Sequence, residues 1–237
     1  MTDRPLAGRL ALVTGASRGI GAATAEALGK AGAHVLLTAR TAGGLEEVED
    51  RIHAAGGSAT IAPLNLVEGD SIARLAAAVS SRWQALDILV LNAATLGSLS
   101  PVPAIDGKEF ASVMTLNVLA QQTLLTAFDP LLRASTAASV IGLTSSVASA
   151  PRAYWGAYAA SKAALETLLL TYAEEVKAIS AIRVAILDPG ATATRMRARA
   201  FPGEDAATLK QPSVVADAIV ALVGEGFETG QRIKLPR

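Results

Sequence analysis

Two residues able to move a proton, Tyr158 and Lys162, stand four positions apart in the sequence. In a helix this spacing puts both side chains on one face. A tyrosine is a poor acid or base at neutral pH, because its pKa is about 10. A lysine ammonium one turn away favours the phenolate and is expected to lower the pKa of the tyrosine. The pair predicts general acid–base catalysis by Tyr158, activated by Lys162.

A second chemical signal is the glycine-rich segment Thr-Gly-Ala-Ser-Arg-Gly-Ile-Gly at positions 14–21. It follows the apolar run 10–13, which is typical of a buried parallel strand, and leads into the helix-forming stretch 20–31. A strand, a glycine-rich turn and a helix together present backbone N–H groups and a helix N-terminus to a pyrophosphate. The position of the glycines on this turn, more than their number, predicts a dinucleotide site.

With further motifs, these residues resemble the short-chain dehydrogenase/reductase family over nearly the whole chain. The family pattern adds Asn-Ala-Gly after the fourth strand, a helix Asn, a Ser thirteen residues before the Tyr, and Pro-Gly-x3-Thr. The matching positions here are Asn92-Ala93-Ala94, Asn117, Ser145, and Pro189-Gly190 with Thr194. Ala94 replaces a glycine, and Asn65 stands where an aspartate often contacts the adenine. Because an asparagine amide can donate and accept, these departures concern the adenine contact and the local turn rather than the chemistry.

The resemblance implies a role for each catalytic residue. Tyr158 acts as the acid when a ketone is reduced and as the base when an alcohol is oxidised. Ser145 hydrogen-bonds the substrate oxygen, and Lys162 lowers the pKa of the tyrosine and binds the nicotinamide ribose. The backbone carbonyl of Asn117 holds a water in a proton relay to Lys162. The cofactor carries the hydride, so the protein supplies geometry and the proton.

Two of these assignments have alternatives in the sequence. Thr144 and Ser146 flank Ser145 and also carry hydroxyl groups, so a shift of one residue would exchange their roles. An asparagine in a long helix, such as Asn117, is often only a surface or kink residue.

The resemblance also implies the residues that hold the cofactor, all near the carboxyl ends of strands, where such folds bind ligands. Thr194 among them is expected to bind the nicotinamide carboxamide. The set is Gly15, Ser17, Arg18, Gly19, Ile20, Gly21, Arg40, Asn65, Leu66, Asn92, Ala93, Ala94, Tyr158, Lys162, Pro189, Gly190, Thr192 and Thr194.

The end of the second predicted strand bears on the choice of cofactor. NAD-dependent enzymes usually place an Asp or Glu there to bind the ribose 2′-hydroxyl. The segment 37–41 contains no acid, but Arg40 can pair with a 2′-phosphate, and Arg18 lies within reach in the glycine-rich turn. NADP(H) is therefore the predicted cofactor. NAD(H) is the alternative if both arginines are only surface charges.

Strands alternate with helices along the whole chain, which predicts an α/β fold. We expect a doubly wound, Rossmann-like, seven-stranded parallel sheet with helices on both faces, in a single domain of residues 1–237. The expected strands are 10–13, 33–38, 59–63, 86–92, 139–144, 182–188 and 231–235. The expected helices lie near 20–31, 43–55, 69–83, 108–132, 157–179 and 212–223.

Composition excludes several other classes. The 237 residues are 51% hydrophobic and carry no formal net charge, so nothing attracts nucleic acid or an anionic membrane. There are no cysteines, and His34 and His53 lack metal-ligand spacing, so no metal site is expected. Residues 1–5 lack the apolar core of a signal peptide, and no apolar run is long enough to span a membrane. A cytoplasmic protein is expected.

The substrate is less well defined by the sequence. The resemblance places a variable flap at 191–211, with Met196, Phe201 and Pro202 among Arg195, Arg197 and Arg199. Its apolar residues favour a small or medium apolar carbonyl compound, and its arginines either meet an anionic group or, as we expect, face water. Expected pocket walls are Leu96, Leu99, Val147 and Met196. Tyr154 and Trp155 either line the substrate mouth or serve packing.

Two classes of function follow from these residues. The first is an NADP(H)-dependent oxidoreductase acting on a carbonyl or alcohol substrate, with an NAD-dependent alcohol dehydrogenase as its variant. The second is a non-catalytic nucleotide-binding protein, either a sensor or a subunit. The resemblance further implies a homodimer or homotetramer that pairs through the helices 108–132 and 157–179.

Overall fold

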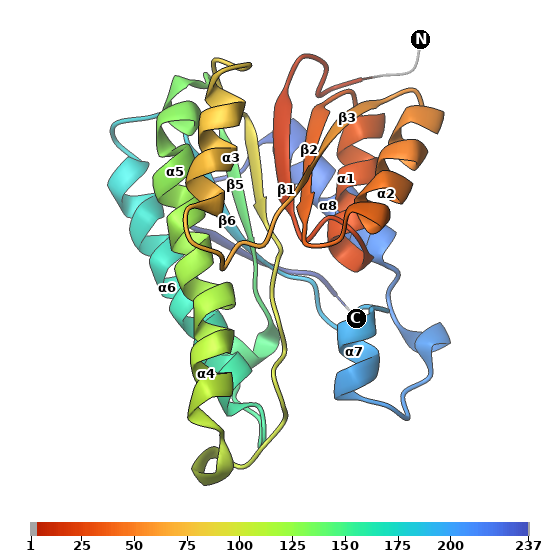
Figure 1. Cartoon of the computed structure of the whole chain (residues 1–237), viewed down its shortest axis with the longest axis vertical. Coiled ribbons are helices and arrows are strands. Elements are labelled where there is room, and N and C mark those ends of the chain that lie inside the picture. Colours follow the sequence, from red (N-terminus) through yellow and green to blue (C-terminus); the bar gives the residue numbers. More distant parts are fainter. Residues whose placement is uncertain (1–3, 237) are drawn as a thin grey trace.

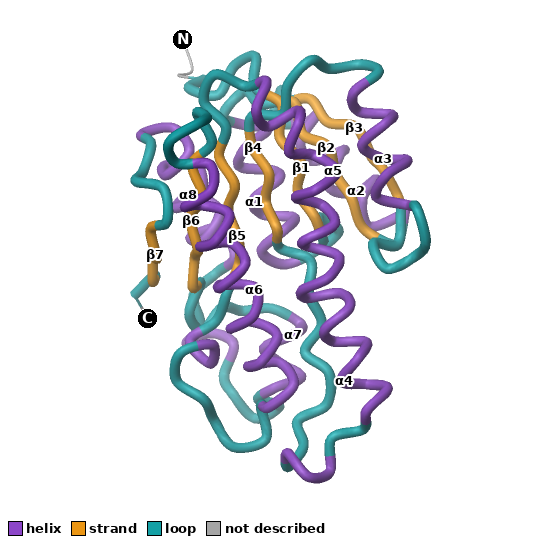
Figure 2. The backbone as a smooth tube through the Cα atoms, turned by 90° about the vertical axis from the view of Figure 1, so that its left-hand side faces the viewer, coloured by secondary structure: helices purple, strands orange, loops and turns teal. Residues whose placement is uncertain are grey.

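The computed structural model describes residues 4–236, so residues 1–3 and 237 of the expected domain lie outside the described part. A single parallel sheet has the strand order β3-β2-β1-β4-β5-β6-β7. Its strands are β1 (Leu10–Thr14), β2 (His34–Ala39), β3 (Ser58–Pro63), β4 (Ile88–Leu91), β5 (Ser139–Leu143), β6 (Arg183–Asp188) and β7 (Gln231–Lys234). Figure 2 shows them side by side, with β7 and β3 at the two edges. The strand order reverses between β1 and β4, which is where doubly wound folds bind ligands.

Helices cover both faces of the sheet (Figure 1). One face carries α1 (Gly19–Lys30), α2 (Ala42–Ala54) and α8 (Pro212–Glu225), and the other carries α3 (Ser71–Ser80), α5 (Ala120–Ala134) and α6 (Gly156–Val176). Figure 1 shows α4 (Gly107–Met114) and α7 (Arg195–Ala200) extending beyond the carboxyl ends of the strands. The predicted doubly wound, Rossmann-like fold is confirmed.

Each strand contributes to two cores because its side chains alternate between the faces. In β1, Ala11 and Val13 pack toward α1, α2 and α8, whereas Leu10 and Leu12 pack toward α3, α5 and α6. This burial on both faces explains why the strand reads as a continuous apolar run rather than an alternating one. Burying each large aliphatic side chain stabilises the fold by about 1.5–3 kcal/mol. The carboxyl ends of the strands are thereby held in a rigid frame.

The expected single helix 108–132 is the main departure from the prediction. The structure divides it into α4, a π-helical turn at Thr115–Leu119, and α5. A π-helical turn holds one more residue per turn than an α-helix, and such turns occur mostly as single bulges at functional sites. The sequence pattern could not reveal the bulge, because apolar periodicity continues on both sides of it. Asn117 lies within this turn.

Across residues 4–236, we find no helix with the length and apolar character needed to cross a membrane.

Candidate active site

The glycine-rich turn 15–21 links β1 to α1 and is closely packed. Gly15 and Gly19 have φ of +66° and +58°, which side chains rarely adopt. A Cβ on Gly21 would lie 2.3 Å from the carbonyl oxygen of Gly15 and 2.5 Å from the Asn92 amide nitrogen. The N-cap residue Arg18 makes no side-chain cap, so no side chain satisfies the first N–H groups of α1 there. A tight turn with an uncapped helix N-terminus fits a pyrophosphate.

Asn92 braces this turn from the neighbouring strand. Its amide nitrogen donates to the carbonyl oxygens of Thr14 at 2.8 Å and Gly15 at 3.3 Å. The Thr14 hydroxyl donates to the Val90 carbonyl and accepts from the N–H groups of Asn92 and Ala93, both at 3.0 Å. The Asn92 side chain therefore shapes the cofactor turn. Thr14 also shapes the turn, although it was not among the predicted site residues. Its position directly before the first glycine of the motif could have indicated this role.

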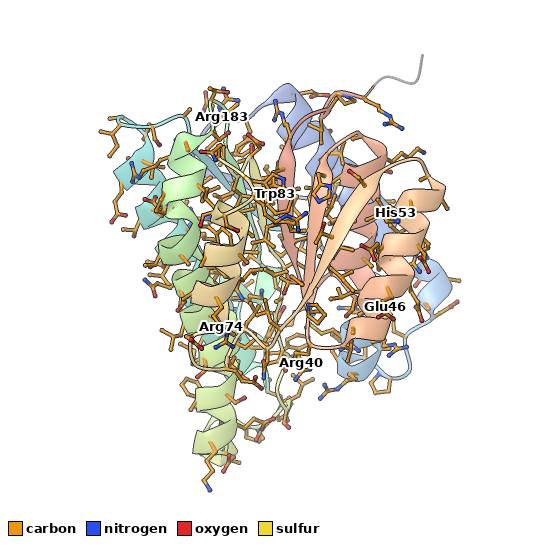
Figure 3. The ribbon with its side chains drawn as sticks, turned by 45° about the horizontal axis from the view of Figure 1, so that its top comes forward. Arg40, Glu46, His53, Arg74, Trp83 and Arg183 are labelled. Atoms are coloured by element: carbon orange, nitrogen blue, oxygen red, sulfur yellow. The ribbon has the colours of Figure 1, made fainter. Side chains whose placement is uncertain are left out.

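Arg40 follows β2 and lies close to the glycine-rich turn. A Cβ on Gly44, at the start of α2, would be 3.0 Å from the Cβ of Ser17, so the two segments are in contact. Arg40 and Arg18 are both exposed, and neither forms an ion pair with a residue in 4–236. Figure 3 shows Arg40 at the end of the sheet opposite Trp83. Two guanidinium groups without an ion-pair partner among the described residues thus lie near the predicted site of a 2′-phosphate.

Asn65 and Leu66 lie in the turn that leads from β3 toward α3. The side-chain amide of Asn65 donates to the Glu68 carboxylate at 2.8 Å, and the backbone carbonyl of Asn65 accepts from the Ser71 hydroxyl at 2.8 Å. Leu66 is partly buried against the core below α3 and α5. Both residues support the local turn, and their contact with an adenine stays a prediction.

Tyr158 and Lys162 both lie in α6 and are almost completely buried, with 8% and 2% of their surfaces exposed. The Lys162 amine is 5.7 Å from the centre of the Tyr158 ring and donates to the Leu143 carbonyl at 2.7 Å. Burial raises the pKa of Tyr158, and the nearby Asp188 carboxylate raises it further. Burial also lowers the pKa of Lys162 to about 8, against the opposing effect of Glu166.

The shared helix face of Tyr158 and Lys162 is as predicted, but the lowered pKa of Tyr158 is wrong for this arrangement. Burial removes the phenolate from water, and the Asp188 carboxylate repels it, so both effects favour the protonated tyrosine. The lysine amine is itself directed to a backbone carbonyl, and its own charge is weakened by burial. The pKa of each residue of the pair is therefore shifted mainly by its own burial.

Ser145 follows β5 and Thr144, in extended backbone conformation. The Thr144 hydroxyl is directed to the Glu166 carboxylate at 2.5 Å, whereas the hydroxyls of Ser145 and Ser146 bond to no residue within 4–236. This bond sets Thr144 apart as a structural residue. The contact of Ser145 with the substrate stays a prediction, with Ser146 as its remaining alternative.

Asn117 is fully buried and joins three elements. Its amide oxygen accepts from the Thr95 N–H at 2.8 Å, and its amide nitrogen donates to the Thr95 carbonyl at 2.9 Å and to the Ser161 hydroxyl at 3.0 Å. Ser161 in turn donates to the Tyr158 carbonyl at 2.8 Å. The alternative of a surface residue is wrong. Asn117 connects the π-helical turn to the turn of α6 that carries Tyr158. Ser161 was not predicted as a site residue, because it is one of the variable positions of the Tyr-x3-Lys motif.

The segment after β6 is fastened by side chains on both sides. Gly190 donates its N–H to the Asp188 carboxylate at 3.0 Å, and Lys210 donates to the Pro189 carbonyl at 3.0 Å. The buried Thr192 hydroxyl donates to the carbonyl oxygens of Pro189 and Gly190, each at 3.3 Å. Thr192 therefore stabilises the conformation of the loop that follows β6.

Thr194 lies near the start of the flap, as the N-cap of α7, and faces the glycine-rich turn. Its hydroxyl accepts from the Arg197 N–H at 3.1 Å, which caps α7. A Cβ on Gly19 would be 3.5 Å from the methyl group of Thr194. The two ends of the predicted cofactor site thus lie next to each other in space, although 175 positions separate them in the sequence (194 − 19).

Apolar side chains of the flap pack directly over Tyr158. The small cluster consists of Leu96, Val147 and Tyr158, with Trp155, Ala159, Met196 and Ala200 against it. The Trp155 ring meets Tyr158 edge-on at 6.0 Å, and Phe201 lies 5.6 Å from Trp155. The described structure thus groups Leu96, Val147 and Met196 around Tyr158, and their role as walls of a substrate pocket stays a prediction. It leaves Leu99 outside the cluster, with 37% of its surface exposed.

The three flap arginines differ from one another. Arg195 and Arg199 are exposed, as expected. Arg197 instead forms a bidentate pair with Glu204, with both N–O distances at 2.5 Å, and lies 3.8 Å above the Phe201 ring. The guanidinium lowers the pKa of the Glu204 carboxyl. Arg197 therefore holds the flap in shape, and the expectation that it faces water is wrong.

Comparison with known proteins agrees with this geometry. A sequence profile of the family described as short chain dehydrogenase matches residues 9–205. The Escherichia coli K12 protein named uncharacterized oxidoreductase YciK is 36% identical over 220 residues, which are 92% of this chain and 86% of that protein. A short chain dehydrogenase structure from Pseudomonas syringae has a TM-score of 0.94 and 39% identity, and the match covers 98% of this chain and 96% of that chain.

A structure complexed with NADPH is also similar. It is a short chain dehydrogenase from Escherichia coli CFT073, with a TM-score of 0.92 and 34% identity, and the match covers 99% of each chain. The profile match extends over most of the chain and ends beyond Tyr158 and Lys162. The protein is therefore an oxidoreductase that belongs to the short chain dehydrogenase family.

Proposed function

We propose that the protein reduces small or medium-sized apolar carbonyl compounds with NADPH, and oxidises the corresponding alcohols in the reverse direction. The observation that carries the proposal is the burial of Tyr158 under the apolar flap, with the buried Lys162 one helical turn away. The glycine-rich turn adjoins the flap through Thr194. A proton donor enclosed by apolar side chains beside a dinucleotide turn supports reduction of a carbonyl group.

The chain's own residues suit each part of this reaction. A bound nicotinamide cofactor would supply or accept the hydride. The Tyr158 hydroxyl would give its proton to the carbonyl oxygen, which Ser145 would hold by a hydrogen bond. Lys162 would contact the nicotinamide ribose and bias the tyrosine toward proton release. Trp155 and Met196 would exclude water from the carbonyl group.

Two observations favour NADP(H) over NAD(H). Arg18 in the glycine-rich turn and Arg40 after β2 are both exposed, and the segment 37–41 contains no acid. The similar Escherichia coli CFT073 protein is complexed with NADPH in its structure. A guanidinium binds a phosphate by charge-assisted hydrogen bonds, so a 2′-phosphate would gain a contact that a 2′-hydroxyl cannot make.

Replacing Arg40 by Asp tests this preference. We expect the affinity for NADPH to fall by roughly ten- to a hundredfold, because a charge-assisted hydrogen bond contributes about 1.5–3 kcal/mol. The affinity for NADH should change little or rise. Titration of purified protein with each cofactor, followed by quenching of Trp155 fluorescence, measures both constants. Arg183→Asp makes the same charge change at the start of β6, at the other edge of the sheet from the carboxyl ends of the strands. It should leave both affinities unchanged. An unchanged ratio in Arg40→Asp would refute the role of Arg40.

The activity itself is tested by screening apolar ketones and aldehydes with NADPH and following the loss of NADPH absorbance. Turnover of at least one carbonyl compound, faster with NADPH than with NADH, is the expected result. Tight binding of NADPH without turnover of any carbonyl or alcohol would favour the alternative, a non-catalytic nucleotide-binding protein.

We further propose that the chain forms a homodimer or homotetramer through α5 and α6. Two apolar residues of this region, Leu119 and Leu168, are 58% and 36% exposed. Burying such a surface against a second copy would remove it from water. Light scattering coupled to gel filtration should give a mass of two or four chains.

A further inference from the structure

A third ionisable residue continues the pattern of Tyr158 and Lys162 along α6. Glu166 follows Lys162 by four positions, so the three side chains leave the same side of the helix. Only 13% of the Glu166 side chain is exposed. One carboxylate oxygen accepts from the Thr144 hydroxyl at 2.5 Å, and the other lies 3.5 Å from the Arg232 guanidinium. Glu166 of α6 is thus held by Thr144, which follows β5, and by Arg232 of β7.

These partners do not account for keeping a carboxylate in so sheltered a place. A buried charge is costly unless an opposite charge lies near it. Arg232 is 62% exposed, so water screens most of its attraction for Glu166. Lys162 is 2% exposed, and the one partner its amine has among the described residues is the neutral carbonyl of Leu143. The two side chains form no ion pair among the described residues, but Glu166 lies one helical turn from the buried amine and is the carboxylate whose charge acts on it.

We propose that Glu166 is a positioning residue of the active site, which holds the Lys162 amine in its charged form and so keeps Tyr158 able to exchange its proton. Thr144 holds the carboxylate in place, and it immediately follows Leu143, whose carbonyl holds the amine. One short segment at the end of β5 thereby fixes both charges. This inference rests on the proposed function of the site.

Other charged groups face the region around Lys162 and Glu166, and their charges decide whether the pKa of Lys162 is raised or lowered. A cavity of about 400 Å³ is lined by Glu166 of α6, Asp188 of β6, and Arg232 and Lys234 of β7. Asp188 is bonded to the Gly190 N–H and acts mainly on Tyr158, whose pKa it raises. Arg232 opposes Glu166, since its positive charge favours loss of protons nearby. Glu166 is the one of these groups that raises the pKa of Lys162.

Replacing Glu166 by Gln removes the charge while keeping the size and an oxygen that accepts from Thr144. Loss of a negative charge lowers the pKa of both Lys162 and Tyr158, so the pair releases its protons at lower pH. The alkaline fall in the rate of carbonyl reduction should therefore move down by about 0.5–1.5 pH units. Glu166→Asp keeps the charge and should restore most of the wild-type profile.

The proposal can be tested without relying on turnover. The chain has six lysines, and NMR of isotopically labelled lysine side chains follows the titration of each one. The Lys162 signal is assigned by its loss in Lys162→Met. We expect the pKa of Lys162 to be lower in Glu166→Gln than in the wild type by about 0.5–1.5 units. Glu174→Gln changes a 72% exposed side chain two turns further along α6 and is the matched control.

Arg232→Gln gives a prediction of opposite sign. Removing this positive charge should raise the pKa of Lys162 and move the alkaline fall in rate to higher pH, by less than Glu166→Gln lowers it. An unchanged pKa of Lys162 in Glu166→Gln would overturn the inference, as would shifts of the same sign in Glu166→Gln and Arg232→Gln. If the pKa of Lys162 falls but no carbonyl compound is reduced, the electrostatic inference stands and the proposed function fails.

Discussion

Replacing Tyr158 by Phe is expected to reduce the rate of carbonyl reduction by about 10²–10⁴-fold, the usual contribution of a positioned proton donor. The phenyl ring can occupy the same place among Leu96, Val147 and Trp155, because those contacts are apolar. Only the hydroxyl group is lost, and no hydrogen bond from it to a described residue has to be broken. NADPH binding and the midpoint of thermal unfolding should therefore change little. Steady-state kinetics with a cofactor titration measures these effects.

Tyr154→Phe is the matched control for this experiment. Tyr154 lies four positions before Tyr158, is 58% exposed, and loses the same hydroxyl group. Its rate should stay within about twofold of the wild type, as is usual for an exposed position away from the reacting atoms. Turnover that persisted in Tyr158→Phe would contradict the assignment of the proton donor, whatever the control showed.

The second large effect is expected from Gly21→Ala in the glycine-rich turn. The added methyl group would lie 2.3 Å from the Gly15 carbonyl oxygen and 2.5 Å from the Asn92 amide nitrogen. Neither atom can withdraw easily, because the carbonyl belongs to the backbone and Asn92 is bonded to Thr14 and Gly15. Overpacking of this kind costs about 1–3 kcal/mol, so NADPH affinity should fall by roughly five- to 150-fold if this strain is relieved at the expense of cofactor binding. Cofactor titration and the midpoint of denaturant unfolding would both report the change.

Gly43→Ala separates this steric effect from the general effect of adding a methyl group. Gly43 lies in the first turn of α2, and a Cβ there would meet nothing within 4 Å. Alanine favours a helix over glycine by about 1 kcal/mol, so stability should be unchanged or slightly higher. Cofactor affinity should also be unchanged. Equal losses of NADPH affinity in both variants would show that close packing of the turn is not the cause.

The sequence by itself determined the features that depend on short segments. The buried apolar run 10–13, the glycine-rich turn and the helix after it are specified by neighbouring residues, and the structure has all three. The common helix face of Tyr158 and Lys162 also follows from local spacing alone. Alternation of such segments was enough to predict the parallel sheet, because a crossover helix must cover its faces. The exact helix boundaries and the π-helical turn were not predicted, since only weak local preferences decide them.

Tertiary structure decided what each polar side chain does. Asn92 braces the turn through Thr14, and Asn117 bonds to Thr95 and Ser161, across separations of 78, 22 and 44 positions. Burial raised the pKa of Tyr158, although the lysine four positions away had predicted the reverse. Arg197, Thr144 and Glu166 likewise found partners that sequence spacing does not encode. Hydrogen bonding and desolvation depend on which distant segments meet, so these roles required the folded chain.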